Sequence, residues 1–247
     1  MSQANSKNKK IPRNVWVLGL VSLLTDTSSK IIQSLFPLFL VSVLGANLIT
    51  VGTIEAIAES AASILKVFSG ALSDYWKKRK VLAIAGYGLS AFVIPIFALA
   101  DRPFWVLIGR LSDRIGKGIR VAPRNALIAD STHSENRGAA YGLRQSLDTI
   151  GATIGPLLAV GLMAASGQNF RLIFGLAIIP GLLAVLLLFL GLKETTEKSN
   201  VQSTFWDWGA LKQLKIDYWL LIAVLLIFNL GNSSDAFLLL RSQNIGI

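Results

Sequence analysis

Long apolar segments constrain the fold of this chain more than any other feature of its sequence. Six of them precede a seventh that begins near Tyr218, and they cover about 15–44, 49–73, 81–100, 104–128, 139–165 and 170–192. A helix needs about 20 apolar residues to span the hydrocarbon core of a bilayer. Helices satisfy their own backbone hydrogen bonds in lipid, whereas open sheets do not. The pattern therefore predicts an all-α integral membrane protein.

The composition agrees with a membrane protein and argues against other classes. Of the 247 residues, 53% are hydrophobic and 15% are charged, whereas soluble domains carry about 25% charged residues. The net charge of +10 suggests nucleic acid at first, but these basic residues lie between apolar runs, where they set membrane orientation. There is no cysteine, and the only histidine, His133, lies in a polar loop. We expect no enzyme, no metal site and no nucleic-acid partner.

The distribution of basic residues predicts the topology. Thirteen Lys and Arg residues fall in 1–13, 77–80, the loop around Arg137, and 193–216, whereas the alternate loops hold two. Lys and Arg are enriched on the cytoplasmic side of membrane proteins. We therefore expect a cytoplasmic N-terminus. The alternation holds only if segment 104–128 crosses the membrane, although a soluble amphipathic helix would carry a similar pattern.

Segment 104–128 carries its charges on one side. At about 100° per residue, they occupy roughly one third of the helix circumference. They are Arg110, Asp113, Arg114, Lys117, Arg120 and Arg124. Ionisable groups inside a membrane are costly unless they face protein or water. We expect this face to line a cavity within a bundle.

Other spans carry charges at matching depth. Asp26 and Lys30 lie in the first span, Glu55, Glu59 and Lys66 share a face of the second, and Arg144 and Asp148 are one turn apart in the fifth. These groups either serve transport or form structural ion pairs. We take as candidate substrate-binding or proton-coupling residues Asp26, Glu55, Glu59, Arg110, Asp113, Arg114, Lys117, Arg144 and Asp148.

An internal similarity predicts a repeat. Ser28-Ser29-Lys30 in the first span resembles Ser233-Ser234-Asp235 in the seventh, and secondary transporters are often built from repeated halves. Asp235 is therefore the candidate second-half equivalent. We expect one complete half and the first helix of a missing C-terminal bundle. The domains would be a cytoplasmic N-terminus (1–13), a six-helix bundle (14–192), a cytoplasmic linker (193–216) and a seventh helix (217–247).

The segment Gly70–Lys80, GALSDYWKKRK, resembles the signature loop of the major facilitator superfamily. Gly70 allows close helix approach, Asp74 can pair with a base or a helix N-terminus, and the basic run anchors the loop inside. Tyr75 and Lys77 replace the usual arginine and glycine. The resemblance implies that Gly70, Asp74 and Arg79 form a gating loop.

Two more motifs resemble that family. Gly142, Gly151, Gly155 and Pro156 keep the spacing of the antiporter motif, a glycine-rich helix that kinks and packs closely, although simple helix contact would explain them as well. Arg114, followed by Gly118, is similar to a buried arginine motif implicated in proton coupling.

The resemblance narrows to a bacterial efflux branch of drug:proton antiporters. It rests on residues 22–40, 54–74, 113–130 and 231–241, and it extends over about 12–247. Lys30 stands where that branch usually has an acid, and Asn125 where it usually has an aspartate. Proton coupling would then rest on Asp26, Glu55 and Glu59.

The resemblance implies a secondary transporter that exports a small molecule by alternating access, in the bacterial inner membrane. The bilayer and the substrate would be its partners, and a proton gradient would drive it without a bound cofactor. The alternative is a truncated membrane remnant or scaffold that transports nothing. The sequence leaves the substrate open.

Overall fold

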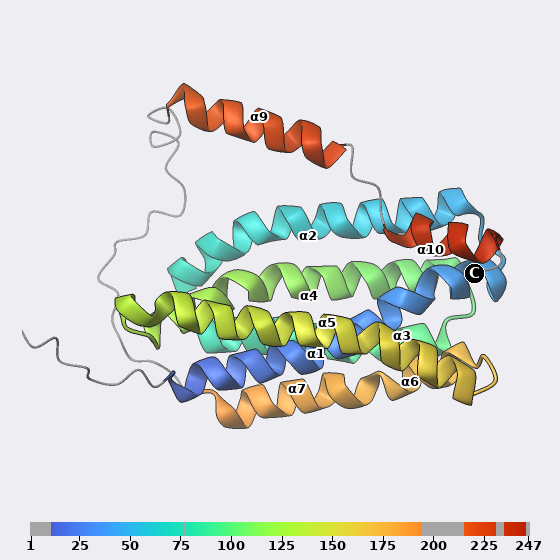
Figure 1. The fold of residues 1–247 in the computed structure, drawn as a ribbon, viewed down its shortest axis with the longest axis horizontal. Helices are drawn as coiled ribbons and strands as arrows, with labels where there is room; N and C mark the ends of the chain where they lie inside the picture. Colours follow the sequence, from blue (N-terminus) through green and yellow to red (C-terminus); the bar gives the residue numbers. More distant parts are fainter. Residues whose placement is uncertain (1–10, 77, 194–214, 231–234, 246–247) are drawn as a thin grey trace, which may run out of the picture.

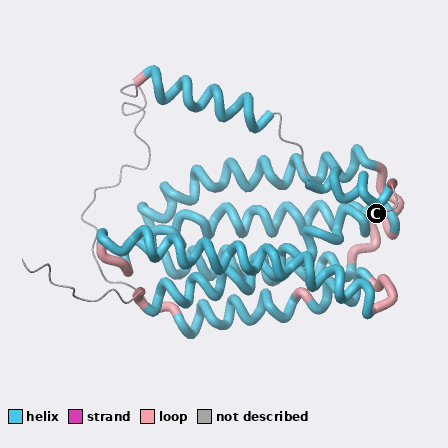
Figure 2. The backbone as a smooth tube through the Cα atoms, viewed as in Figure 1, coloured by secondary structure: helices cyan, strands magenta, loops and turns pink. Residues whose placement is uncertain are grey.

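A computed structural model describes residues 11–76, 78–193, 215–230 and 235–245. Within these residues the chain is almost entirely helical and has no strand (Figures 1 and 2). The helices are α1 (Arg13–Ser42), α2 (Leu48–Trp76), α3 (Arg79–Leu99), α4 (Pro103–Asp130), the 3₁₀ turn η1 (Ser134–Asn136), α5 (Arg137–Ala165), α6 (Phe170–Leu176), α7 (Ile178–Gly191), α9 (Ile216–Leu230) and α10 (Asp235–Asn244). The prediction of an all-α bundle is confirmed.

Within the described residues, five segments are long and apolar enough to cross a bilayer by length and composition alone. They are α1, Leu48–Ala71 of α2, α3, Ser134–Ala165, and Phe170–Gly191. The fourth helix is not among them because its charges lower its apolarity. Nevertheless α4 has 28 residues and packs lengthwise against both α2 and α3 (Figure 1). Packing against α2 and α3, rather than its own apolarity, therefore holds α4 in the bundle.

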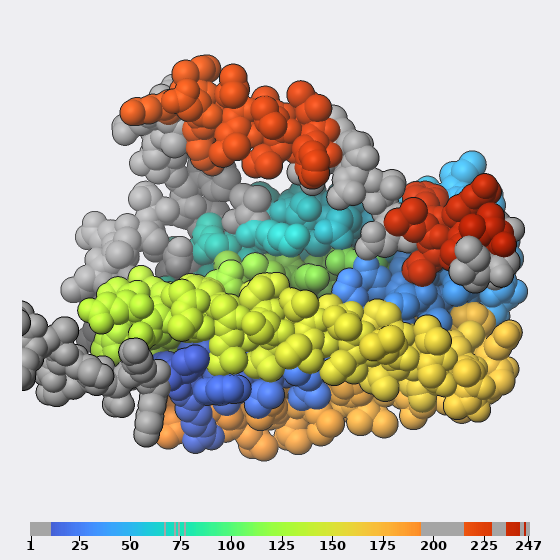
Figure 3. Space-filling model, viewed as in Figure 1, coloured from blue at the N-terminus to red at the C-terminus, as the bar shows by residue number. Residues whose placement is uncertain are grey.

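The helices form a continuous series of neighbouring pairs. The most extensive contacts join α5 to α1, α1 to α7, α7 to α3, α3 to α4, and α4 to α2. In the space-filling view α5 covers much of the near face beside α1, and α10 packs at one end against α1 and α2 (Figure 3). Helix α9 stands apart from the bundle (Figure 1).

Two apolar cores lie at opposite ends of the bundle. One contains Phe39, Phe97 and Phe174, with the Phe39 and Phe174 rings 5.3 Å apart in an edge-on arrangement. The other contains Leu18 and Leu127 from α1 and α4. The charged residues of α1, α4 and α5 fall between these two cores along each helix. The bundle therefore encloses a polar band at mid-depth.

The sixth span differs from the single helix expected over 170–192. It consists of α6 and α7, which meet at Ala177. Pro180 has no N–H to donate to the carbonyl of Leu176, and the hydroxyl of Ser28 donates to the Ala177 carbonyl at 2.6 Å. The proline and the hydroxyl together account for the break.

The region expected as one helix over 217–247 also differs. It contains α9 and α10, and residues 231–234 between them lie outside the described part. The 15 residues of α9 are fewer than the roughly 20 that span a bilayer. The expected cytoplasmic segments fall largely outside the described residues, namely 1–10 and 194–214.

Glycines bring α1 and α5 into close contact. A Cβ on Gly151 would overlap the carbonyl oxygen of Leu23, and one on Gly155 would lie 2.9 Å from the Thr27 carbonyl oxygen. By contrast, Gly142 is exposed and has nothing within 4 Å of a built Cβ. Two of the three motif glycines therefore lie in the helix contact, and Gly142 does not.

A Gly151→Ala substitution is expected to lower the thermal unfolding midpoint, because the Leu23 backbone cannot yield without separating α1 from α5. Overpacking of this kind costs about 1–3 kcal/mol. Tryptophan fluorescence of the purified chain in detergent would measure the midpoint. Gly161→Ala is the matched control, since this α5 glycine has open space around it and alanine is the better helix former. Equal midpoints for the two variants would contradict the packing role.

Candidate functional site

The charged face of α4 points into the bundle. Arg110, Arg114, Arg120 and Arg124 are 2%, 8%, 3% and 8% exposed, while Asp113 and Lys117 on the same face are half-buried. A buried guanidinium group is tolerated only when it is paired or hydrogen-bonded. Arg110 and Arg114 meet side chains of α2, and Arg120 and Arg124 meet side chains of α3, so α4 connects its neighbouring helices through its charges.

Arg110 joins α4 to α2 and α1. Its Nε donates to Oε1 of Glu55 at 2.9 Å, and its Nη2 bonds the same oxygen. The guanidinium carbon also lies 4.5 Å from the centre of the Phe36 ring, within cation–π range. Glu55 is itself largely buried. The predicted residues Arg110 and Glu55 are thus direct partners.

Arg114 forms a second ion pair with α2, and this pair is more exposed to solvent than the pair of Arg110. Its Nη1 lies 3.2 Å from Oε2 of Glu59, and Lys66 lies 4.0 Å from the other oxygen. The Glu59 side chain is 51% exposed, so solvent screens this pair more than the Arg110 pair. Glu59 therefore lies at the edge of the polar band.

Arg120 and Arg124 of α4 both contact Tyr87 of α3. The Arg120 guanidinium stacks 4.4 Å from the Tyr87 ring centre and donates to Ser90 Oγ at 2.7 Å. Arg124 Nη1 lies 3.4 Å from both the Tyr87 hydroxyl and Ser22 Oγ. Tyr87 and Ser90 were not predicted. The detectable signal was a lone tyrosine in an otherwise uncharged, apolar span.

Two aspartates face each other across the contact between α1 and α5. Asp26 and Asp148 lie close enough for their carboxyl groups to interact. Arg144 Nη2 donates to Asp148 at 2.7 Å. Lys117 lies close enough to Asp26 to interact with its charge. Two neighbouring carboxylates repel each other, so the pair favours holding a proton on one of its members.

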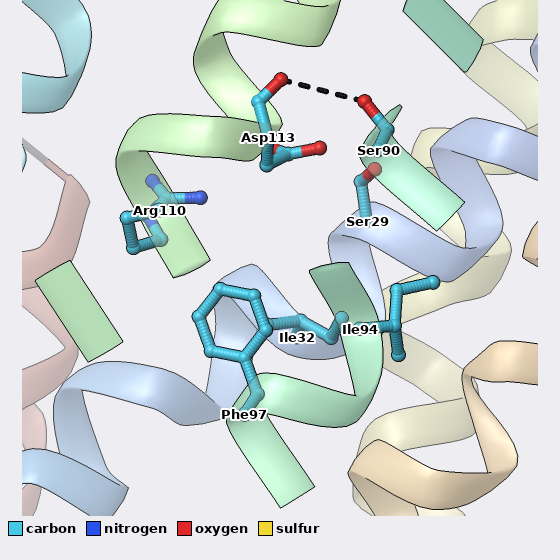
Figure 4. A pocket seen from close by; sticks show the side chains of 7 residues that line it. All are labelled: Ser29, Ile32, Ser90, Ile94, Phe97, Arg110 and Asp113. Atoms are coloured by element: carbon cyan, nitrogen blue, oxygen red, sulfur yellow. Dashed lines mark hydrogen bonds between the residues drawn. The ribbon is translucent and has the colours of Figure 1, made fainter. Parts of the chain in front are cut away.

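A small pocket adjoins the Arg110 end of the polar band (Figure 4). Figure 4 shows Arg110 and Asp113 of α4 opposite side chains of α3 and α1, and Ser90 donates to the Asp113 backbone carbonyl at 3.4 Å. The pocket measures about 10 Å³, about the space that a single water molecule occupies. Its lining residues are Ser29, Ile32, Ser90, Ile94, Phe97, Arg110 and Asp113.

At the end of the bundle expected to face the cytoplasm, α3 is tied to α4. Arg79 forms an ion pair with Asp130, the last residue of α4. A Cβ atom added to Gly70 would lie 4.0 Å from the Cβ atom of Ala122 in α4. The side chain of Asp74 lies outside the described residues. Asp130 was not predicted, although it follows an apolar run at a helix end.

The same end carries a hydrogen-bonded junction that sequence reasoning did not identify. The Asn14 amide donates to Ser131 Oγ at 3.1 Å and to the Lys193 carbonyl at 2.9 Å, and the Lys193 N–H donates back to Asn14 at 3.1 Å. The junction ties together the ends of α1, α4 and α7. A single asparagine at the start of an apolar span gave no pattern to recognise.

Two other expectations concern metal binding and the repeat residue Asp235. Within the described ranges, no cluster of three or more His, Asp or Glu side chains could hold a metal ion. The side chain of Asp235, the candidate repeat residue, is not among those described.

The family follows from comparison with known sequences. The sequence model of the Major Facilitator Superfamily matches residues 18–244. The chain belongs to this superfamily. It is 32% identical over 243 residues to an uncharacterized MFS-type transporter of Methanocaldococcus jannaschii, covering 98% of this chain and 60% of the relative. The multidrug resistance protein MdtH of Yersinia enterocolitica is 27% identical over 163 residues, covering 66% of this chain and 39% of the relative.

Solved structures of the superfamily share the fold. A bacterial homolog to the human lysosomal transporter Spinster, inward-facing and occupied, aligns with a TM-score of 0.62 at 18% identity, covering 76% of this chain and 46% of that one. The peptide transporter POT in complex with sulfate aligns at 0.60 and 17% identity, covering 92% and 48%. The chain spans about half the length of these superfamily members. It is a multi-pass membrane protein of the transporter type.

Proposed function

We propose that this chain is part of a proton-coupled exporter of small molecules in a prokaryotic plasma membrane, with its N-terminus in the cytoplasm. The name of the MdtH relatives, multidrug resistance protein, supports efflux. Alternating access needs two bundles that move about a central site, so a second helical bundle is the proposed partner. The proposed driving force is the proton gradient, and the transport cycle requires no cofactor.

The pair of neighbouring carboxyl groups of Asp26 and Asp148 carries this proposal. It lies between the two apolar cores, at a depth where titratable groups mark proton pathways. Arg144 bonds one carboxyl group, and Lys117 interacts with the other. Loss of a proton from Asp26 adds a negative charge that attracts Lys117 of α4. A proton arriving at Asp26 would therefore weaken the hold of α4 on α1.

Helix α4 would transmit this change. It contacts α2 through Arg110 and Arg114, and it contacts α3 through Arg120. A shift of α4 relative to α1 would therefore also move the ion pair of Arg79 and Asp130. We assign that pair to the cytoplasmic gate, with Gly70 and Asp74, which lie in the last turns of α2 and not in a loop.

An Asp26→Asn substitution tests the proposal, because asparagine keeps the size of the side chain and cannot exchange a proton. Proteoliposomes would contain the chain together with its proposed second helical bundle, the pH dye pyranine and an imposed pH gradient, and they would receive lipophilic cations, anions and zwitterions in turn. We expect proton flux driven by a transported compound to fall at least about tenfold, because the residue is the proposed mid-membrane proton carrier. Asp101→Asn is the control, since Asp101 is exposed in a loop.

Unchanged flux in Asp26→Asn would overturn the assignment of the proton site. If no compound moves protons with the unmodified chain even when the second bundle is present, the result favours the alternative, a membrane component that does not transport. The unfolding midpoint of each variant must match the unmodified chain, so that lost flux is not lost folding.

A further inference from the structure

A larger cavity lies on the open side of the bundle, one helical turn along α1 and α5 from Asp26 and Asp148. It is bordered by α1, α2, α5 and α10 and measures about 210 Å³. Lys30, Gln33 and Phe36 of α1, Glu55 of α2, Pro156 of α5 and Leu239 of α10 line it. This is smaller than the roughly 300–1,000 Å³ of pockets for drug-sized ligands. The cavity therefore fits a small organic molecule.

The charge of this cavity is unbalanced. Glu55 already accepts two hydrogen bonds from Arg110 on one oxygen, so its charge is neutralised. Among the described residues, Lys30 has no carboxylate within ion-pair distance, and Gln33 makes no side-chain hydrogen bond. Lys30 is only partly buried. The described part of the lining thus offers one ammonium group without an ion pair and one amide without a side-chain hydrogen bond.

The remaining lining is apolar. Phe36, Pro156 and Leu239 face the same cavity from three different helices. A binding site that combines an apolar wall with a few convergent polar groups fixes the orientation of a ligand through those groups. A cation would meet Lys30 at close range and be repelled. A carboxylate or phosphonate would pair with it in a partly desolvated site, where the attraction is stronger than in water.

We propose that this cavity binds a small organic anion, with its anionic group on Lys30 and Gln33 and its apolar body against Phe36, Pro156 and Leu239. The inference builds on the proposed function, because it names the chemical class of the exported compound. Lys30 is then the residue that selects charge, and the Glu55–Arg110 pair is the fixed wall beside it.

Binding can be tested on the purified full chain in detergent without any transport assay. The probes are benzoate, its neutral analogue benzamide and its cationic analogue benzylamine, with hexanoate and phenylphosphonate as further anions. At about ten times its dissociation constant, an anion that binds the folded state is expected to raise the unfolding midpoint by about 3 °C. Benzamide and benzylamine are expected to leave it unchanged.

The absence of cysteine in the sequence allows a charge-restoration test. Lys30→Met and Lys30→Cys are expected to abolish the shift caused by benzoate, and Lys30→Arg to retain it. Treating Lys30→Cys with 2-aminoethyl methanethiosulfonate attaches an ammonium group by a disulfide and should restore the shift, whereas methyl methanethiosulfonate should not. Lys215→Met is the matched control, since this lysine is exposed at the start of α9.

Three outcomes would overturn the inference: equal stabilisation by benzamide, an undiminished benzoate shift in Lys30→Met, or no stabilisation by any of the three anions. The transport proposal fails separately. Anion binding that depends on Lys30, without proton flux in liposomes, would refute export and leave the site intact. Proton flux with other compounds, without anion binding, would refute the site alone.

Discussion

An Arg110→Met variant is expected to unfold about 10 °C below the unmodified chain, because it leaves the buried Glu55 carboxylate without its partner. Removing one member of a buried ion pair costs about 3–5 kcal/mol, and each kcal/mol corresponds to roughly 2–4 °C for a chain of this size. The substitution also removes the contact between the guanidinium group and the Phe36 ring. Tryptophan fluorescence during heating in detergent would measure the midpoint.

Two further variants separate the ion pair from general damage. Arg102→Met removes a cation whose pair with Asp101 is exposed, and exposed pairs contribute only about 0–1 kcal/mol. The double variant Arg110→Met with Glu55→Leu removes both charges and is expected to regain most of the lost stability. If the double variant is less stable than Arg110→Met, the ion pair is not the source of the effect.

A Tyr87→Ala substitution is expected to be similarly harmful, with a loss of about 4 kcal/mol in the free energy of unfolding. Truncating a buried aromatic residue costs about 3–5 kcal/mol through lost burial and a remaining cavity. Here the ring also stacks on Arg120, and its hydroxyl meets Arg124. The variant would leave two buried cations facing an empty space.

Tyr87→Phe is the matched control for the ring. It keeps the stacking on Arg120 and removes only the hydroxyl, which is worth about 1 kcal/mol as one hydrogen bond. The two unfolding midpoints, compared with the unmodified chain, give the contribution of the ring. A Phe variant as unstable as the Ala variant would show that the hydroxyl, not the stacked ring, holds the two arginines.

The overall fold could be predicted because the length of the apolar segments and the spacing of charges along the sequence indicate the helices and their inward faces. Apolar length gave the spans, and the charges of α4 gave the side of that helix that faces inward. The break at Ala177 was missed because it depends on a hydroxyl from α1 as well as on Pro180. A contact between helices far apart in the chain leaves no periodic pattern.

The site could be predicted only as a set of charged residues. Spacing along one helix predicted the pair of Arg144 and Asp148, since i and i+4 lie on the same face. It could not predict that Arg110 bonds Glu55, or that Asp26 faces Asp148, because those partners depend on how helices are rotated against each other. Among the uncharged partners, Tyr87 was marked only by being a lone tyrosine in an apolar span, and Asn14 carried no signal. The transport roles of the candidate residues stay predictions.

The charged face of α4 also bears on how the chain enters the membrane during synthesis. Each Arg, Lys or Asp at the centre of a helix adds about 2.5–3.5 kcal/mol to the free energy of insertion, and α4 carries six such residues between Arg110 and Arg124. Two of its carboxylate partners, Glu55 and Glu59, belong to α2, which is synthesised earlier. Asp148 of α5 is synthesised later. Lipid alone is therefore a poor environment for α4, and its insertion depends on the helices that precede it.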